Sequence, residues 1–479
     1  MMLTMKKRIL LTCLCGLILS AKAQSPQDVY ARPLGEVLER IAECYEVDLL
    51  YEPKILRGQT VSFADWKMFA DVETTLSNVL APLELRYVKK EGNIYEIKKW
   101  EYFRKPVEEG RKHLEALWAS YSSLELWKTR KVKVRENMLE KLGLSPLPVR
   151  NDLNPIRSNY RVHDGYSAEN YALEIIPGVY LCGTLYRPLK VKSNVPAMLC
   201  PHGHFYNKVD KSIPNERGRY REDQQKRCAT LARMGVIVFS YDMFAWGEYS
   251  YQVPLKEHRS GFAVTMQTWG TMRVVDFLCS MKEVDKKRIG ITGASGGGTQ
   301  TFLGAALDER ITLSVPVVMV SSYFFGGCPC ESGLPIHFLD NGLQSNNAEV
   351  AALIAPKPLL VISDGNDWTT SVPEIEFPYL QKVYGLYGCK SNVENTHLPL
   401  EQHDYGFSKR KAMYDFVARQ FKLDSRKVQD KDGNFDESEV TVEPASEMYV
   451  FGNENHYPVN AAHGVEEIRV ALQKQMNVH

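Results

Sequence analysis

Residues 288–298 read Arg-Ile-Gly-Ile-Thr-Gly-Ala-Ser-Gly-Gly-Gly, and this stretch decides the fold. Its apolar first half predicts a buried strand, and the glycines after Ser295 open a helix from about Gly298. A G-x-S-x-G sequence between a strand and a helix is typical of a nucleophile elbow, a tight turn that exposes the serine Oγ above a sheet. The helix start offers N–H groups to an anion. The alternative, a glycine-rich phosphate loop, lacks both usual spacings.

A nucleophilic serine needs a base, and the base needs a group that orients it. After a nucleophile elbow the acid and then the histidine follow along the chain. His403 lies between a predicted last strand and last helix, whereas its competitor His397 falls where that strand should run. Asp367 follows the predicted strand 358–363 and is the favoured acid. Glu331 lies beyond the preceding strand and is the alternative, and the two carboxylates can also share the role.

The segment Cys200-Pro-His-Gly-His follows the predicted strand 196–200. It resembles the loop that supplies a backbone N–H to an oxyanion hole. We expect the N–H groups of His204 and Gly296 to form that hole. The alternative is a metal site at His202 and His204, but no acidic or cysteine partner is evident. We therefore predict neither metal nor cofactor.

From about residue 158 the chain alternates between apolar runs and helical segments. Three opening strands are predicted to be antiparallel, and the continuous Val/Ile/Leu runs that follow predict parallel strands buried on both faces. The predicted class is α/β, an α/β-hydrolase fold with a mostly parallel central sheet, preceded by a small α+β domain. The opening strands are 159–163, 171–176 and 179–186, and the later ones are 196–200, 236–241, 288–292, 314–320 and 358–363.

Five segments are predicted in total. They are a signal peptide at 1–23, a small α+β domain at 24–99, a helical connector at 100–157, the catalytic domain at 158–424, and a tail at 425–479 that packs on it. The second segment resembles the short N-terminal domain of secretins and TonB-dependent receptors through residues 33–38, 48–51 and 76–85. That resemblance implies a partner in the cell envelope, and an unrelated α+β module is the alternative.

The N-terminus has a basic start, a short apolar run and a small-residue cleavage site, which predicts export to the periplasm or the medium. Cleavage after Ala23 would leave 55 basic and 58 acidic residues, a net charge of −3. So balanced a charge excludes a global field for nucleic acid or anionic lipid. We predict no membrane-spanning segment. The Cys328-Pro-Cys330 pair is too isolated to predict zinc.

Residues 207–227 carry seven Lys or Arg against four Asp or Glu and leave the predicted oxyanion loop. A cationic rim there suits a uronate-rich substrate, because arginine binds carboxylates in a bidentate way. The alternative is a solvated helix face with paired charges. The residues predicted to contact substrate are Arg217, Arg221, Trp246 and Trp368.

Residues 150–425 resemble the carbohydrate-esterase branches of the α/β-hydrolases. The likeness to acetylxylan esterases lies in residues 201–204, 241–242 and 293–297, and the two candidate acids are similar to glucuronoyl esterases. The arginine that follows the nucleophile in glucuronoyl esterases is replaced by Gly296-Gly297. The resemblance implies a serine esterase of plant glycans, with methyl esters of pectin favoured and O-acetyl groups on xylan or pectin as the alternative. A non-catalytic periplasmic binding or signalling protein is the rival from another class.

Overall fold

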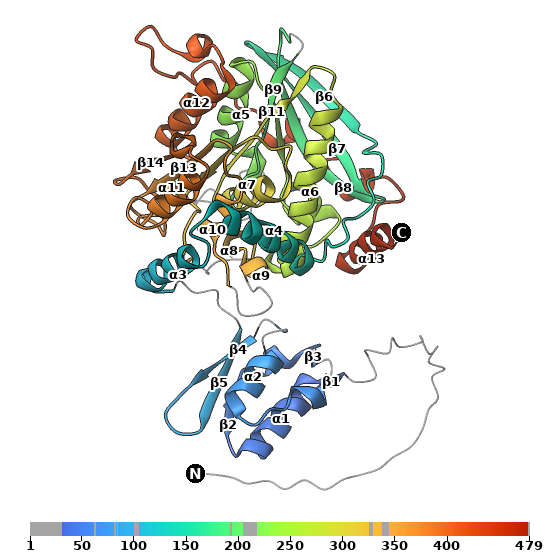
Figure 1. Ribbon diagram of the computed structural model, residues 1–479. Coiled ribbons are helices and arrows are strands. Elements are labelled where there is room, and N and C mark those ends of the chain that lie inside the picture. Colours follow the sequence, from blue (N-terminus) through green and yellow to red (C-terminus); the bar gives the residue numbers. More distant parts are fainter. Residues whose placement is uncertain are drawn as a thin grey trace. The chain divides into compact units, whose positions relative to one another are not determined.

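The structure is a computed structural model in which the chain forms two compact units, residues 1–101 and 102–479 (Figure 1). The residues that it describes are 31–61, 64–80, 83, 85–99, 105–191, 194–204, 218–324, 329–337 and 344–477. The predicted signal peptide and Arg217 lie outside these ranges. The five predicted segments otherwise remain predictions.

The first unit is a small α+β domain. Helices α1 (Leu34–Tyr45) and α2 (Val72–Leu80) pack their apolar faces over a three-stranded sheet of order β2-β5-β4. Its strands are β2 (Asp48–Leu50), β4 (Leu85–Lys89) and β5 (Ile94–Lys99), and a separate pair joins β1 (Arg32–Pro33) to β3 (Thr60–Val61). The resemblance of this unit to a secretin-type domain stays a prediction.

The second unit is built on a nine-stranded sheet of order β14-β13-β12-β11-β9-β10-β8-β7-β6. Pairing is parallel from β14 to β10 and antiparallel from β10 to β6, so the predicted α/β class with a mostly parallel sheet is confirmed. The strands are β6 (Ile156–His163), β7 (Tyr166–Ile176), β8 (Val179–Pro188), β9 (Val195–Leu199), β10 (Ile237–Tyr241), β11 (Val284–Ala294), β12 (Leu313–Val317), β13 (Leu359–Asp364) and β14 (Val393–Leu398).

Helices cover both faces of this sheet, which explains why its central strands are apolar throughout (Figure 1). Ala197 and Leu199 of β9 belong to the hydrophobic cluster that holds α6, α7 and α11, whereas Met198 packs in the cluster that holds α5 and α12. The helices are α3 (Val107–Ser120), α4 (Leu124–Lys141), α5 (Glu222–Arg233), α6 (Gly261–Ser280), α7 (Gly296–Leu307), α8 (Pro329–Ser332), α9 (Leu334–His337), α10 (Asn347–Ala352), α11 (Glu376–Leu386), α12 (Phe407–Phe421) and α13 (Val465–Met476).

The topology marks one edge of the sheet as the place for a site. From β9 the chain goes to β10 on one side, and later to β11 on the other, so the strand order reverses at β9. Ligands of open α/β sheets bind at the carboxyl ends of the strands beside such a reversal. The loops after β9, β11, β12 and β13 all leave from that edge.

None of the helices in the described ranges combines the length and the apolar character needed to cross a bilayer.

Candidate active site

Ser295 sits in a strained turn between β11 and α7. Its φ of 57° and ψ of −126° lie where side chains other than glycine are rarely found. The helix begins at Gly296, two residues before the predicted start. A Cβ on Gly293 or Gly297 would lie 2.5 or 2.6 Å from the carbonyl oxygen of Pro201. The glycines of the motif therefore allow the loop after β9 to pass directly against the elbow.

The structure brings Ser295, His403 and Asp367 together. His403 Nε2 lies 2.9 Å from Ser295 Oγ, and His403 Nδ1 lies 2.6 Å from Asp367 Oδ2. The other oxygen of Asp367 accepts from the N–H and the hydroxyl of Thr369, which orients the carboxylate. This is the geometry in which a histidine can take a proton from a serine.

His397, the competitor of His403, and Asp364, a second carboxylate at the end of the strand that precedes Asp367, make other contacts. His397 lies on β14, and its Nδ1 is 2.9 Å from Ser363 Oγ. Asp364 ends β13 and lies 3.3 Å from Lys409 Nζ. Burial, together with the neighbouring Asp367 charge, raises the pKa of Asp364 to about 6.

Glu331, on helix α8, also lies close to the hydroxyl of Ser295. Glu331 Oε1 lies 2.9 Å from Ser295 Oγ, the same distance as His403 Nε2, so the single hydroxyl proton is donated to one of these two acceptors at a time. His204 Nδ1 lies 2.8 Å from the same oxygen of Glu331. Burial opposes ionisation, but His204 and the hydrogen bonds from His204 and Ser295 outweigh it and lower the pKa of Glu331 to about 2. The two ring nitrogens of His403 face Asp367 and Ser295, so Asp367 is the carboxylate that meets His403 Nδ1.

The two histidines of the loop after β9 differ in their partners. His202 is buried, accepts the Met243 N–H at its Nε2 and faces the Gly203 carbonyl oxygen through Nδ1. Burial lowers the pKa of His202 to about 3, so its ring is neutral. His204 instead faces Glu331 and His258. The alternative in which His202 and His204 share a metal ion is therefore not supported by their contacts.

One group in the described ranges has donor atoms close enough to hold an ion. The ligand atoms of His204, His258 and Cys330 lie within 4.8 Å of one another. However, Cys330 forms a disulfide, and it is a thiolate that binds zinc. The two Nε2 atoms are 2.5 Å apart, a hydrogen-bond distance that leaves no space for an ion between them. With Cys330 in a disulfide and the two histidine rings in contact, this group does not fit a metal ion.

The sequence did not identify His258, which lies in a short 3₁₀ segment, Leu255–Arg259. A lone histidine with no regular spacing to the other site residues carries no motif. Only the packing of this segment against the loop after β9 brings it to the site.

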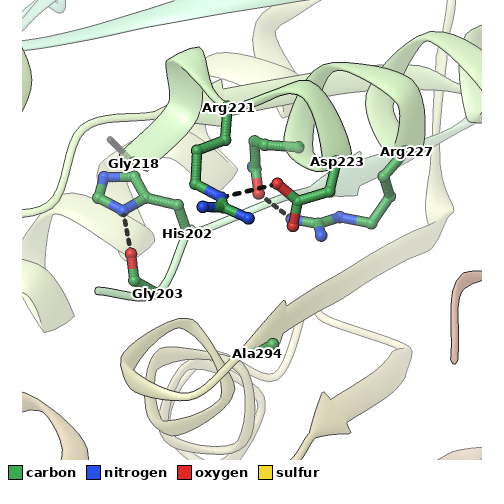
Figure 2. A pocket seen from close by; sticks show the side chains of 8 residues that line it. His202, Gly203, Gly218, Arg221, Asp223, Arg227 and Ala294 are labelled. Carbon is green, nitrogen blue, oxygen red and sulfur yellow. Dashed lines mark hydrogen bonds and ion pairs between the residues drawn. The ribbon is translucent and has the colours of Figure 1, made fainter. Parts of the chain in front are cut away.

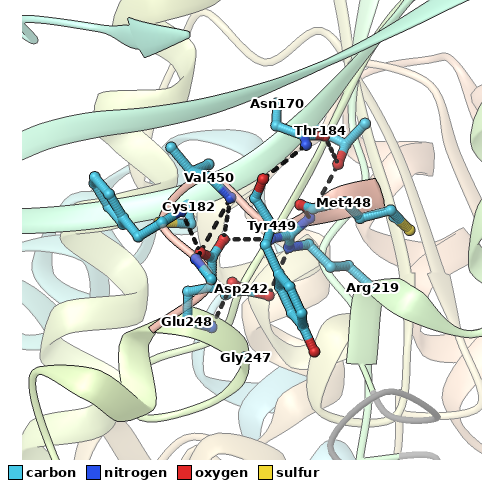
Figure 3. Close-up of polar contacts among 12 residues, drawn as sticks. Asn170, Cys182, Thr184, Arg219, Asp242, Gly247, Glu248, Met448, Tyr449 and Val450 are labelled. Atoms are coloured by element: carbon cyan, nitrogen blue, oxygen red, sulfur yellow. Dashed lines mark hydrogen bonds and ion pairs between the residues drawn. The ribbon is translucent and has the colours of Figure 1, made fainter. Parts of the chain in front are cut away.

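The prediction that residues 207–227 form a cationic rim is wrong for two arginines, Arg219 and Arg227. Arg219 is fully buried, 2.8 Å from Asp242 and 3.0 Å from Glu248, and it donates to the Met448 carbonyl of the C-terminal tail (Figure 3). Arg227 is also buried, with its guanidinium over the Tyr405 ring. A charge at this depth needs a partner because it has lost its water. These arginines hold the fold together.

The remaining described cations of this segment are paired. Lys226 forms an (i, i+4) pair with Glu222, as a solvated helix face would. Arg221 lies 2.8 Å from Asp223 Oδ1 and lines a small pocket together with His202 and Gly203 of the loop after β9 (Figure 2). The cavity measures about 10 Å³, which is room for about one water molecule. Binding of substrate by Arg221 remains a prediction.

The two predicted tryptophans both lie at the site. The centroid of the Trp368 ring lies 4.4 Å from that of His403, and the Trp368 ring stacks on Phe324 with the centroids 4.2 Å apart. Trp246 is buried, with its ring 5.5 Å from His204 and 5.7 Å from His258. A family model described as "Glucuronyl esterase, fungi" matches residues 235–326, the stretch that contains Trp246 and Ser295.

Several known proteins are similar to this chain. Methylesterase BT1017, a solved structure, is 42% identical, aligns with 95% of this chain and 99% of its own, and has a TM-score of 0.71. The 4-O-methyl-glucuronoyl methylesterase of Thermothelomyces thermophilus is 26% identical over 171 residues, which is 29% of this chain and 42% of that protein. The enzyme of the same name from Cerrena unicolor is 34% identical over 100 residues, 20% of each chain. The chain thus spans less than half the length of these two curated relatives.

Proposed function

We propose that this chain, which belongs to the carbohydrate esterases of the α/β-hydrolase fold, hydrolyses methyl esters of uronic acids in a plant cell-wall polysaccharide. The observation that carries the substrate class is the 42% identity, over nearly the whole of both chains, to a protein named as a methylesterase. The hydrogen bonds at Ser295 support the ester chemistry. They also argue against a non-catalytic glycan-binding protein, which would have no need of a strained serine turn.

In this proposal Ser295 attacks the carbonyl carbon of the ester, and His403 takes the hydroxyl proton. Asp367 keeps the proton of His403 on Nδ1 and stabilises the imidazolium. The backbone N–H groups of Gly296 and His204 bind the oxyanion. His403 returns the proton to methanol as it leaves, and a water molecule, activated by the same histidine, then releases the uronate from Ser295.

The finer assignments are part of the proposal. We favour methyl-esterified pectin over other uronic-acid polymers and O-acetyl esters as the second candidate, and we propose that the protein acts in the periplasm or the medium after loss of residues 1–23. The N-terminal unit would then contact an envelope partner. Support comes from the amino-terminal sequence pattern and from the likeness of residues 33–38 to receptor domains.

The test is to incubate the purified mature chain with methyl-esterified pectin, methyl glucuronate esters and acetylated xylan, and to measure methanol and acetate separately. We expect methanol from the uronate esters, with the highest kcat/KM on pectin. Ser295→Ala is the control for contaminating esterases. Acetate without methanol would move the assignment to O-acetyl esters, and methanol from glucuronate esters alone would exclude pectin.

A further inference from the structure

A row of four groups runs away from the nucleophile on the side opposite His403. Glu331 Oε1 accepts from Ser295 and faces His204 Nδ1, His204 Nε2 faces His258 Nε2, and His258 Nδ1 lies 2.7 Å from the Phe244 carbonyl oxygen. The proposed reaction uses only the backbone of His204 and makes no use of His258.

Hydrogen-bond accounting assigns the protons in this row. A carbonyl oxygen only accepts, so His258 Nδ1 carries a proton, and burial lowers the pKa of His258 so far that its ring is neutral. His258 Nε2 is therefore an acceptor, and the proton between the two rings belongs to His204. Cys330 Sγ lies 3.0 Å from His204 Nε2 and 3.1 Å from His258 Nε2, but a disulfide sulfur has no proton to donate, so this assignment is unchanged. An ionised Glu331 also only accepts, so His204 Nδ1 is protonated as well. His204 is then an imidazolium ion.

The His204 ring lies against the predicted oxyanion hole. A Cβ on Gly296 would be 3.3 Å from His204 Cε1, so the ring packs on the residue that follows the nucleophile. The charged and titratable groups around the ring are Glu331 of α8, His258 of the 3₁₀ segment and His202 of the same loop, with His403 beyond Ser295. The neutral His202 and His258 leave Glu331 as the counter-charge.

We infer that His258 is a positioning residue that keeps His204 doubly protonated, so that the His204 cation offsets the Glu331 charge while negative charge develops on the ester oxygen. Without that cation, an ionised carboxylate hydrogen-bonded to the attacking hydroxyl would oppose formation of the oxyanion. The inference rests on the proposed esterase function of Ser295, but not on the identity of the ester.

The test compares His258→Leu with His258→Gln in the mature chain, using 4-nitrophenyl acetate and a methyl uronate ester. Leucine removes the acceptor, whereas the glutamine amide can accept from His204 and donate to the Phe244 carbonyl. We expect His258→Leu to lower kcat by about 10²-fold with little change in KM. The alkaline limb of its pH profile should move to lower pH, because the protonated ring has lost an acceptor. His258→Gln should restore most of both.

The matched control is His163→Leu, which removes a largely buried histidine at the end of β6 that pairs with Glu443 of the C-terminal tail. It should leave kcat and the pH profile unchanged. Histidine ¹⁵N signals of the wild-type protein give a second measurement that needs no variant. Two protonated ring nitrogens on His204 at the pH of activity are expected, and a single one overturns the inference.

Other outcomes separate the two proposals. If His258→Leu lowers kcat with an unmoved alkaline limb and glutamine does no better, His258 is only structural and the inference fails. If a chelator abolishes activity and zinc restores it, the two rings serve an ion and the inference fails. Turnover of 4-nitrophenyl acetate without the methyl ester refutes the proposed substrate alone, and turnover of neither ester overturns both proposals.

Discussion

Two rows of hydrogen-bonded groups meet at the hydroxyl of Ser295, and they differ in what they can do with a proton. The row from the loops after β13 and β14 is short: Asp367 takes one nitrogen of His403 and leaves the other, a base, against Ser295. The row from α8 begins with a carboxylate whose pKa is about 2, too weak a base to take the serine proton.

The comparison shows that distance to the serine does not decide the role of a carboxylate. Glu331 is hydrogen-bonded to Ser295 and Asp367 is not, yet only Asp367 faces His403. What matters is which histidine nitrogen each carboxylate meets. Four substitutions test this difference between the two rows.

Removal of Ser295 Oγ, where the two rows meet, should lower kcat the most. Ser295→Ala should lower kcat by about 10⁶-fold, because water must then attack the bound ester directly. Methanol or acetate release would be followed with protein whose fold is checked by circular dichroism. Activity within tenfold of the wild type would mean that the nucleophile lies elsewhere.

A substitution of Asp367 should lower kcat less than the substitution of Ser295 does. Asp367→Asn should lower kcat by about 10⁴-fold, because the amide no longer holds the proton of His403 on Nδ1. Asp404→Asn is the matched control: this half-exposed carboxylate follows His403 in sequence but pairs with Lys409. If the control loses as much as Asp367→Asn, the loss reflects the loop and not the triad.

A substitution of Glu331, in the row from α8, should lower kcat less than the substitution of Asp367 does. Glu331→Gln should lower kcat by about 10²-fold, because the His204 ring that packs on Gly296 loses the carboxylate that keeps its Nδ1 protonated. The lowered pKa of Glu331, about 2, keeps the carboxylate ionised as the pH falls to about 4, so the acid limb of the pH profile should have the same midpoint in the variant. A loss as large as that of Asp367→Asn would assign the triad acid to both carboxylates.

The aromatic neighbours should give the smallest effects. Trp368→Leu removes the ring stacked near His403 and should lower kcat/KM about fivefold, equivalent to about 1 kcal/mol of stacking. Measured on the polysaccharide and on 4-nitrophenyl acetate, the loss should be greater on the polysaccharide if Trp368 contacts sugar. Equal losses on both substrates would mean that the ring only supports His403.

Local patterns were enough to predict much of the fold and the members of the short row. The buried strands from β9 to β13 are visible as apolar runs because both of their faces are covered. The glycines around Ser295 mark the elbow because larger residues would collide with Pro201. His403 and Asp367 could be identified because each follows a strand at the same sheet edge.

Charge patterns, by contrast, were misleading. An arginine-rich segment has the same sequence pattern whether its side chains border a cleft or are buried. Arg219 is buried because Asp242 and Glu248, from elsewhere in the chain, pair with it (Figure 3). Burial of a charge depends on partners that no local pattern reveals.

The sequence by itself determined the fold class, the nucleophile turn and the pair of candidate acids, because each depends on residues that are neighbours along the chain or on the order of strands. Only the tertiary structure placed Asp367 against His403 and Glu331 against His204, and brought His258 to His204, 54 residues away. Hydrogen bonds of this kind need donor and acceptor atoms placed to within a few tenths of an ångström. Such positions arise only when separate loops pack together at one edge of the sheet.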